Sequence, residues 1–129
     1  MTTNTVAEHG FANLGLSVKL LERLTERNLL QPTPIQRGAI PPALEGNDIL
    51  GIAQTGTGKT LAFSLPLMQR LARGGGQALI VVPTRELALQ INEALTRVAE
   101  KVGLRTAVLI GGMPMGGQRQ ALSRNPDII

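Results

Sequence analysis

The chain has 129 residues, of which 43% are apolar, so it can bury one modest core. It has no cysteine, which excludes disulfides and cysteine metal sites and suits a cytoplasmic protein, and its apolar runs are too short to cross a membrane. The net charge of +4 fits either a polyanionic partner or ordinary solubility, and the only aromatic residues, Phe11 and Phe63, are too few to hold a nucleic acid by base stacking.

The first predicted element is a helix that begins after Ser17. Residues 1–10 form a polar stretch that we expect to be flexible, and residues 11–129 would form the domain. Ser17 can cap the helix, whose apolar face would contain Val18, Leu20, Leu21 and Leu24. A second helix is expected with Thr33 as N-cap and Pro34 at its first position, although the same residues could form only a rigid turn.

A glycine-rich turn between a strand and a helix is the most informative stretch. Residues 48–53 are mostly apolar and predict a buried strand, and a helical pattern starts at Leu61. The turn between them ends in Gly58-Lys59-Thr60, which is typical of a loop that curls its backbone N–H groups around a phosphate. Lys59 would reach the outer phosphates and Thr60 Oγ1 would bind Mg²⁺. The alternative is an ordinary glycine-rich turn.

The rest of the chain alternates between strands and helices. Strands are expected at 78–82, covered on both faces, at 106–110 and at 126–129. One expected helix has the apolar face Leu61, Leu65, Met68 and Ala72, with Pro66 inside it. A second has the apolar face Leu87, Ile91, Leu95 and Val98, and a short third helix is expected over 118–124. This alternation predicts an α/β fold with a parallel sheet. The phosphate loop, Pro83-Thr84-Arg85 and Gly111-Gly112 would share the rim at the carboxyl ends of its strands.

Several motifs together resemble those of the DEAD-box RNA helicases. They are Phe11, Pro32-Thr33-Pro34-Ile35-Gln36, Ala53 to Thr60, Pro83 to Ala88 and Gly111-Gly112, in the order and approximate spacing of that family. The resemblance covers nearly the whole chain after residue 10 and implies a P-loop, RecA-like domain that is truncated and of bacterial type. It also implies ATP-dependent unwinding or remodelling of RNA, with ATP and Mg²⁺ as cofactors, RNA held by its backbone, and no membrane.

The resemblance implies a role for each matched residue. Gln36 would bind adenine through its amide, and Phe11 would pack on the base. The residues implied in triphosphate and Mg²⁺ binding are Thr55, Gly56, Thr57, Gly58, Lys59 and Thr60, of which Lys59 and Thr60 would also serve catalysis. The residues implied in gripping one RNA strand are Pro83, Thr84, Arg85, Gly111 and Gly112; a surface ion pair is the alternative for Arg85.

The sequence also departs from the family pattern. Asn28-Leu29 stands where the family usually has Gly-Phe, and the 129 residues contain neither a Thr-Pro-Gly-Arg nor an Asp-Glu-Ala-Asp sequence. We therefore expect these residues alone not to hydrolyse ATP and to fold poorly as a monomer. The alternative functions are another P-loop ATPase that acts on DNA or protein, a non-hydrolysing module that binds nucleotide or RNA, and a truncation without a function of its own.

Overall fold

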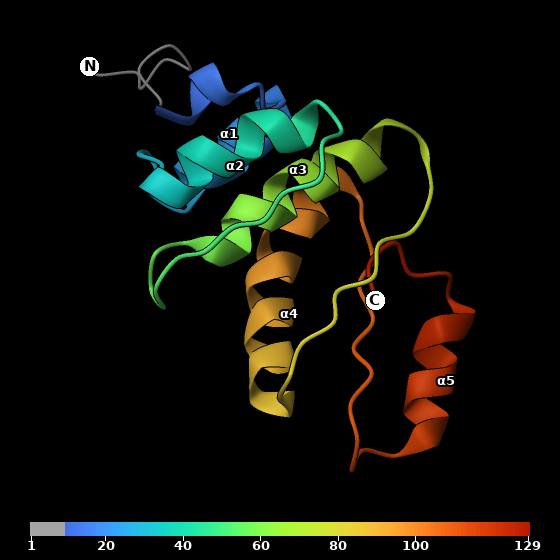
Figure 1. Cartoon of the computed structure of the whole chain (residues 1–129). Coiled ribbons are helices and arrows are strands. Elements are labelled where there is room, and N and C mark those ends of the chain that lie inside the picture. The colour runs from blue at the N-terminus through green and yellow to red at the C-terminus, as the bar shows by residue number, and fades with distance from the viewer. Residues whose placement is uncertain (1–9) are drawn as a thin grey trace. The chain divides into compact units, whose positions relative to one another are not determined.

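The computed structural model describes residues 10–129 and divides into two compact units (Figure 1). One unit extends to Arg70 and the other comprises Leu71–Ile129. The expected flexible stretch lies outside the described residues except for Gly10, which begins the 3₁₀ helix η2 (Gly10–Leu14) and donates its N–H to Leu30 O at 2.9 Å. No helix within residues 10–129 has the length and apolar character that a membrane crossing requires.

The first unit is built on the helices α1 (Val18–Glu26), α2 (Pro34–Leu44) and most of α3 (Lys59–Gly74). Ser17 caps α1 as predicted, because its Oγ accepts from Leu20 N–H at 3.4 Å. Pro66 lies inside α3, also as predicted. The core of this unit contains the fully buried side chains Phe11, Leu20, Leu24, Ile40, Leu65 and Met68. The prediction for Val18 was wrong: it is 59% exposed, because it stands at the first helical position, ahead of the buried stripe.

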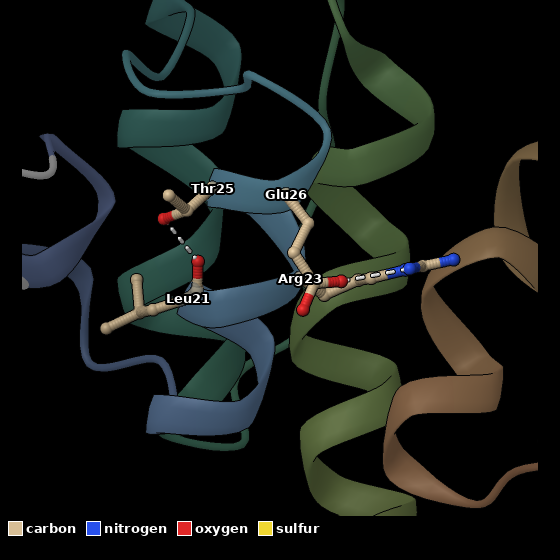
Figure 2. A network of polar contacts seen from close by, with 4 residues as sticks. All are labelled: Leu21, Arg23, Thr25 and Glu26. Carbon is tan, nitrogen blue, oxygen red and sulfur yellow. Dashed lines mark hydrogen bonds and ion pairs between the residues drawn. The ribbon is translucent and has the colours of Figure 1, made fainter. Parts of the chain in front are cut away.

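Two polar contacts lie within α1, one between charged side chains and one from a side chain to the backbone (Figure 2). Arg23 Nη1 pairs with Glu26 Oε2 at 3.0 Å, and both side chains are partly exposed. Thr25 Oγ1 donates to Leu21 O at 2.9 Å within the same helix. An exposed ion pair contributes at most about 1 kcal/mol, so α1 is held mainly by its apolar face.

A buried amide joins α3 to the start of α1. Gln69 is 3% exposed, and its Nε2 donates to Gly15 O at 2.9 Å. Its Oε1 accepts from Ser17 N–H at 2.6 Å. Because both ends of the amide are paired, this polar group can be buried without a large desolvation penalty.

The turn after α1 explains one departure from the family pattern. Asn28 has a φ of +57°, which places it in the left-handed region. Its N–H donates to Thr25 O at 2.9 Å, so the residue ends the helix. Glycine is the usual residue in that region, and asparagine is among the few others that tolerate it. The substitution therefore preserves the backbone of this turn.

The prediction of a buried strand at 48–53 was wrong for this structure. The segment forms no strand, and Leu50 and Ile52 are 90% and 87% exposed. A strand needs a neighbour for its backbone groups, and no other segment among the described residues pairs with this one. Its apolar side chains therefore stay in contact with solvent.

The second unit contains the expected parallel pairing in a reduced form. Ile128 bridges both Ala78 and Thr106 in the parallel sense, so 127–129 lies between the two other segments. The hydrogen bonds include Ala78 N–H to Asp127 O at 2.8 Å and Ala107 N–H to Ile128 O at 2.9 Å. The expected cover on both faces of 78–82 is missing, because nothing in this unit packs over Leu79 and Val81, which are 72% and 82% exposed.

The helices of the second unit are α4 (Arg85–Ala99), the 3₁₀ helix η3 (Glu100–Val102) and α5 (Met115–Ser123). On α4, Leu95 and Val98 are buried as predicted, whereas Leu87 is 36% exposed. An apolar groove of about 250 Å³ lies between α4 and the segments 79–82 and 106–109. Helix α5 begins at Met115 rather than Gln118, with Pro114 as its N-cap, although Gly116 and Gly117 have poor helix propensity.

Candidate functional sites

The phosphate loop leads directly into a helix. Gly56 and Gly58 have φ values of +80° and +83°, and α3 begins at Lys59. The loop is closed by Thr57 Oγ1, which donates to Gln54 O at 2.5 Å. Ala62 N–H donates to Gly58 O at 3.2 Å and forms the first backbone hydrogen bond of α3. The N–H groups of the helical residues before Ala62 therefore have no acceptor within the helix. Free N–H groups and the positive end of the helix dipole favour an anion at this position.

Gln36 connects α2 to this loop. Its Nε2 donates to Gly58 O at 3.1 Å, and its Oε1 accepts from Thr33 N–H at 2.9 Å. The side chain is 3% exposed. Any Cβ at Gly58 would lie 2.3 Å from Gln36 Nε2, so only glycine fits there. Because both ends of the amide are paired, contact with an adenine would require Gln36 to exchange these partners.

Two further side chains near the N-cap of α2 are withdrawn from solvent. Thr33 Oγ1 is buried and has no hydrogen-bond partner within residues 10–129, and it lies 3.1 Å from the position of a Cβ at Gly58. Phe11 is only 1% exposed. Its ring is thus part of the core, and packing on a base would require it to become accessible.

Lys59 and Thr60 stand in the first turn of α3. Lys59 is exposed and forms no ion pair with any described residue, so its ammonium can reach an anion in the loop. Thr60 is half-buried. Its hydroxyl fits as one oxygen ligand of a Mg²⁺ ion that also binds phosphate. No group of three acidic or histidine side chains within residues 10–129 could hold a metal ion without such a phosphate.

A second site lies in the other unit, where Arg85 meets Gly112. Thr84 caps α4, because its Oγ1 accepts from Leu87 N–H at 3.1 Å. Arg85, the first residue of α4, has no carboxylate partner in the described part of the chain. Its Nη1 lies 2.5 Å from the position of a Cβ at Gly112, whose φ is +80°. The guanidinium therefore rests on the backbone of the glycine turn.

Only some of the residues predicted to bind RNA are in contact with one another. Pro83, Thr84 and Arg85 are exposed, and Gly112 is in contact with Arg85. Gly111 has an ordinary φ and open space around its Cα. The shared rim expected for the phosphate loop and this turn spans both units and stays a prediction.

Sequence reasoning missed Gln118, which holds the glycine turn. Its Nε2 donates to Ile110 O at 2.9 Å and to Met113 O at 3.3 Å. It was missed because α5 starts earlier than predicted, so that Gln118 is in its first full turn rather than at its start. An amide side chain six residues after a Gly-Gly pair was the available signal.

Comparison with known proteins defines the family. A model of the DEAD/DEAH box helicases matches residues 33–129, well over half of the chain. This chain therefore belongs to the DEAD/DEAH box helicase family. It is 48% identical over 122 residues to the probable ATP-dependent RNA helicase DDX49 of Homo sapiens, and the matched stretch covers 93% of this chain and 25% of that protein. Identity to the ATP-dependent rRNA helicase RRP3 of Meyerozyma guilliermondii is 46%, over 94% of this chain and 26% of that protein.

Solved structures confirm the α/β, RecA-like fold class. The RNA helicase Prp28 from Chaetomium thermophilum bound to ADP has a TM-score of 0.83 and 41% identity, over 90% of this chain and 30% of that chain. A DEAD box protein from Methanococcus jannaschii has a TM-score of 0.85 and 34% identity, over 92% of this chain and 33% of that chain. The chain spans about a quarter of the length of the curated relatives that it matches. The bacterial type is not borne out, since these relatives are human and fungal.

Proposed function

We propose that the protein is an ATP-dependent RNA helicase, in which this chain supplies the nucleotide site and part of the RNA path. The observation that carries the proposal is the phosphate loop, with two left-handed glycines, a Lys59 at the helix start that has no ion-pair partner within residues 10–129, and Gln36 bonded to Gly58. The family membership and the ADP bound to Prp28 support the same assignment.

ATP binding would use the loop and α3 together. The N–H groups at the start of α3 and the Lys59 ammonium would neutralise the phosphates, and Thr60 Oγ1 would bind Mg²⁺. The Gln36 amide would exchange its bonds to Gly58 and Thr33 for the edge of adenine. This exchange would give the site a preference for ATP over GTP, because the two bases present different donors and acceptors.

RNA binding would use the contact between Arg85 and Gly112. Arg85 places a positive charge at the positive end of the α4 dipole. This repulsion costs about 0.3–1 kcal/mol, and binding of an anion at the same place relieves it. A phosphate of the RNA backbone supplies that anion, and the exposed glycine backbone allows it to approach closely. Such contacts do not depend on the base sequence.

For the 129 residues by themselves, we propose nucleotide binding without turnover. Hydrolysis by this class of enzyme needs carboxylates to hold Mg²⁺ and to position water. The described residues contain no cluster of acidic side chains that could do both. Lys59-dependent release of phosphate by the purified chain would contradict this.

The nucleotide site is tested by Lys59→Ala, with Lys19→Ala as the matched control on the exposed face of α1. Both variants lose one exposed lysine. We expect Lys59→Ala to weaken binding of a fluorescent ATP analogue by more than about tenfold, which corresponds to about 1.4 kcal/mol, and Lys19→Ala to bind like the wild type. Equal affinities of the two variants would refute the proposed nucleotide site.

The RNA site is tested by Arg85→Ala, with the exposed Arg73→Ala as control. Affinity is measured for two single-stranded RNAs of equal length and unrelated sequence at several salt concentrations. Loss of one phosphate contact should lower the slope of log affinity against log salt by about 0.7, equally for both RNAs. A loss confined to one RNA sequence would argue against backbone recognition.

A further inference from the structure

We infer that Gln118 is a positioning residue for RNA binding, because it fixes the turn Ile110–Met113 on which Arg85 rests. The inference depends on the proposed RNA site and adds a residue to it. The amide of Gln118 donates to Ile110 O and to Met113 O, at 2.9 and 3.3 Å. These two carbonyls stand at the start and the end of the turn, so one side chain closes it.

The turn needs an external clamp for two reasons. Gly112 has a φ of +80°, and a Cβ at Gly111 would meet no atom within 4 Å, so side-chain packing does not restrain these two glycines, which have many accessible backbone conformations. The following helix gives little help, because its N-cap is Pro114, which offers no side-chain acceptor to the first helical N–H groups. The amide of Gln118 is the side-chain group that bonds both ends of the turn.

The clamp acts on Arg85 through Gly112. Arg85 Nη1 lies within van der Waals contact of the Gly112 Cα region, since any Cβ there would be 2.5 Å away. The exposed Arg85 has no carboxylate partner within residues 10–129 that could hold it instead. A fixed glycine turn therefore limits the orientations of the guanidinium, and pre-organisation of this kind lowers the entropy cost of binding a phosphate.

The test compares Gln118→Met with Gln120→Met. Methionine keeps an unbranched side chain of similar length and good helix propensity but removes the donor. Gln120 is an exposed residue of the same helix whose side chain forms no hydrogen bond with a described residue, so its replacement controls for the chemical change. Thermal melts of both variants check that the fold is retained.

The first measurement is the backbone amide order parameter by NMR, which needs no RNA. We expect the order parameters of Gly111, Gly112 and Met113 to fall from about 0.85 towards about 0.6 in Gln118→Met, because the turn loses both of its side-chain hydrogen bonds, and to remain unchanged in Gln120→Met. Unchanged order parameters in Gln118→Met would overturn the inference, whatever the RNA affinity.

The second measurement is a double-mutant cycle with Arg85→Ala on single-stranded RNA. Gln118→Met should weaken binding by about three- to tenfold in the wild-type background and have no further effect when Arg85 is absent. Equal losses in both backgrounds would overturn the inference, because Gln118 would then act independently of Arg85. If Arg85→Ala alone leaves the affinity unchanged, the proposed RNA site fails, while lower order parameters in the turn would still support the clamp.

Discussion

The phosphate loop and the turn Ile110–Met113 are built alike but expose different chemistry. Each has a glycine with φ near +80° that contacts a side chain from a different helix, Gln36 at Gly58 and Arg85 at Gly112. In the first turn the contacting group is a buried, neutral amide with both ends paired. In the second it is an exposed cation without a carboxylate partner in the described residues.

A side chain that lies close to a glycine backbone can have different uses, depending on its charge and burial. A buried amide against a backbone carbonyl has a fixed direction, which suits discrimination between ligands by their hydrogen-bonding edges. An exposed cation on an open backbone attracts any nearby phosphate, which suits binding without sequence preference. We therefore expect the same local arrangement to serve selectivity in one unit and general affinity in the other.

The largest effect should come from Gly58→Ala. The alanine would have to keep the left-handed backbone of Gly58, which costs about 1–2 kcal/mol. Its Cβ would also lie 2.3 Å from Nε2 of the buried Gln36 amide, which is an overlap. Binding of an ATP analogue should fall by more than about tenfold and the melting temperature should drop. Gly56→Ala is the control, because Gly56 has a similar φ but open space around it. Equal losses would mean that the Gln36 contact is unimportant.

Gln36 variants should come next. Gln36→Ala leaves Thr33 N–H and Gly58 O without their partner, which should cost about 1–3 kcal/mol in the free energy of unfolding and abolish any preference for ATP over GTP. Gln36→Glu keeps the acceptor for Thr33 but places a buried carboxylate oxygen against Gly58 O, so its loss at neutral pH should be at least as large. Denaturant melts and competition by GTP measure both effects. Unaltered nucleotide preference in Gln36→Ala would remove Gln36 from base recognition.

Gly112→Ala should be milder than Gly58→Ala. The backbone strain is similar, but the contacting atom is the flexible end of an exposed arginine, which can move away. We expect a loss of about 1–2 kcal/mol in the free energy of unfolding and a lower affinity for RNA. Gly111→Ala, with open space and an ordinary φ, serves as the reference in RNA titrations. The comparison of the two turns fails if Gly112→Ala destabilises the fold more than Gly58→Ala.

The smallest effect on stability is expected for Ile52→Lys, in the segment that precedes the phosphate loop. Ile52 is 87% exposed, so the change should alter the free energy of unfolding by no more than about 0.5 kcal/mol and should raise solubility. Ala107 occupies the corresponding place before the second turn and is 7% exposed with its N–H bonded to Ile128. Ala107→Lys should therefore destabilise strongly. A large loss in Ile52→Lys would show that residues 48–53 are packed in solution.

The sequence predicted local features better than paired ones. The caps at Ser17 and Thr84 depend on a side chain and an N–H three residues later, so a short stretch of sequence determines them. The fate of residues 48–53 depends on a partner strand elsewhere, which periodicity cannot reveal. The same reason explains why Leu79 and Val81 were expected to be covered.

The candidate sites show the same division. The residues of the phosphate loop and of Thr84-Arg85 follow from motifs in one segment. The bond from Gln36 to Gly58 joins residues 22 apart, and the contact between Arg85 and Gly112 joins the start of α4 to a distant turn, so neither could be derived from spacing alone. Gln118 was missed because its function depends on where α5 begins, and helix boundaries are set by tertiary context as well as by propensity.

The position of Ile128 has a consequence for synthesis on the ribosome. The chain emerges from its amino end, so the segments 78–80 and 105–107 appear well before 127–129, the segment that bonds to both. Until Ile128 arrives, the earlier two have no backbone partner and expose apolar side chains in an aggregation-prone state. Of the three paired segments, the central one is thus made last, and until then the other two are open to association with other chains.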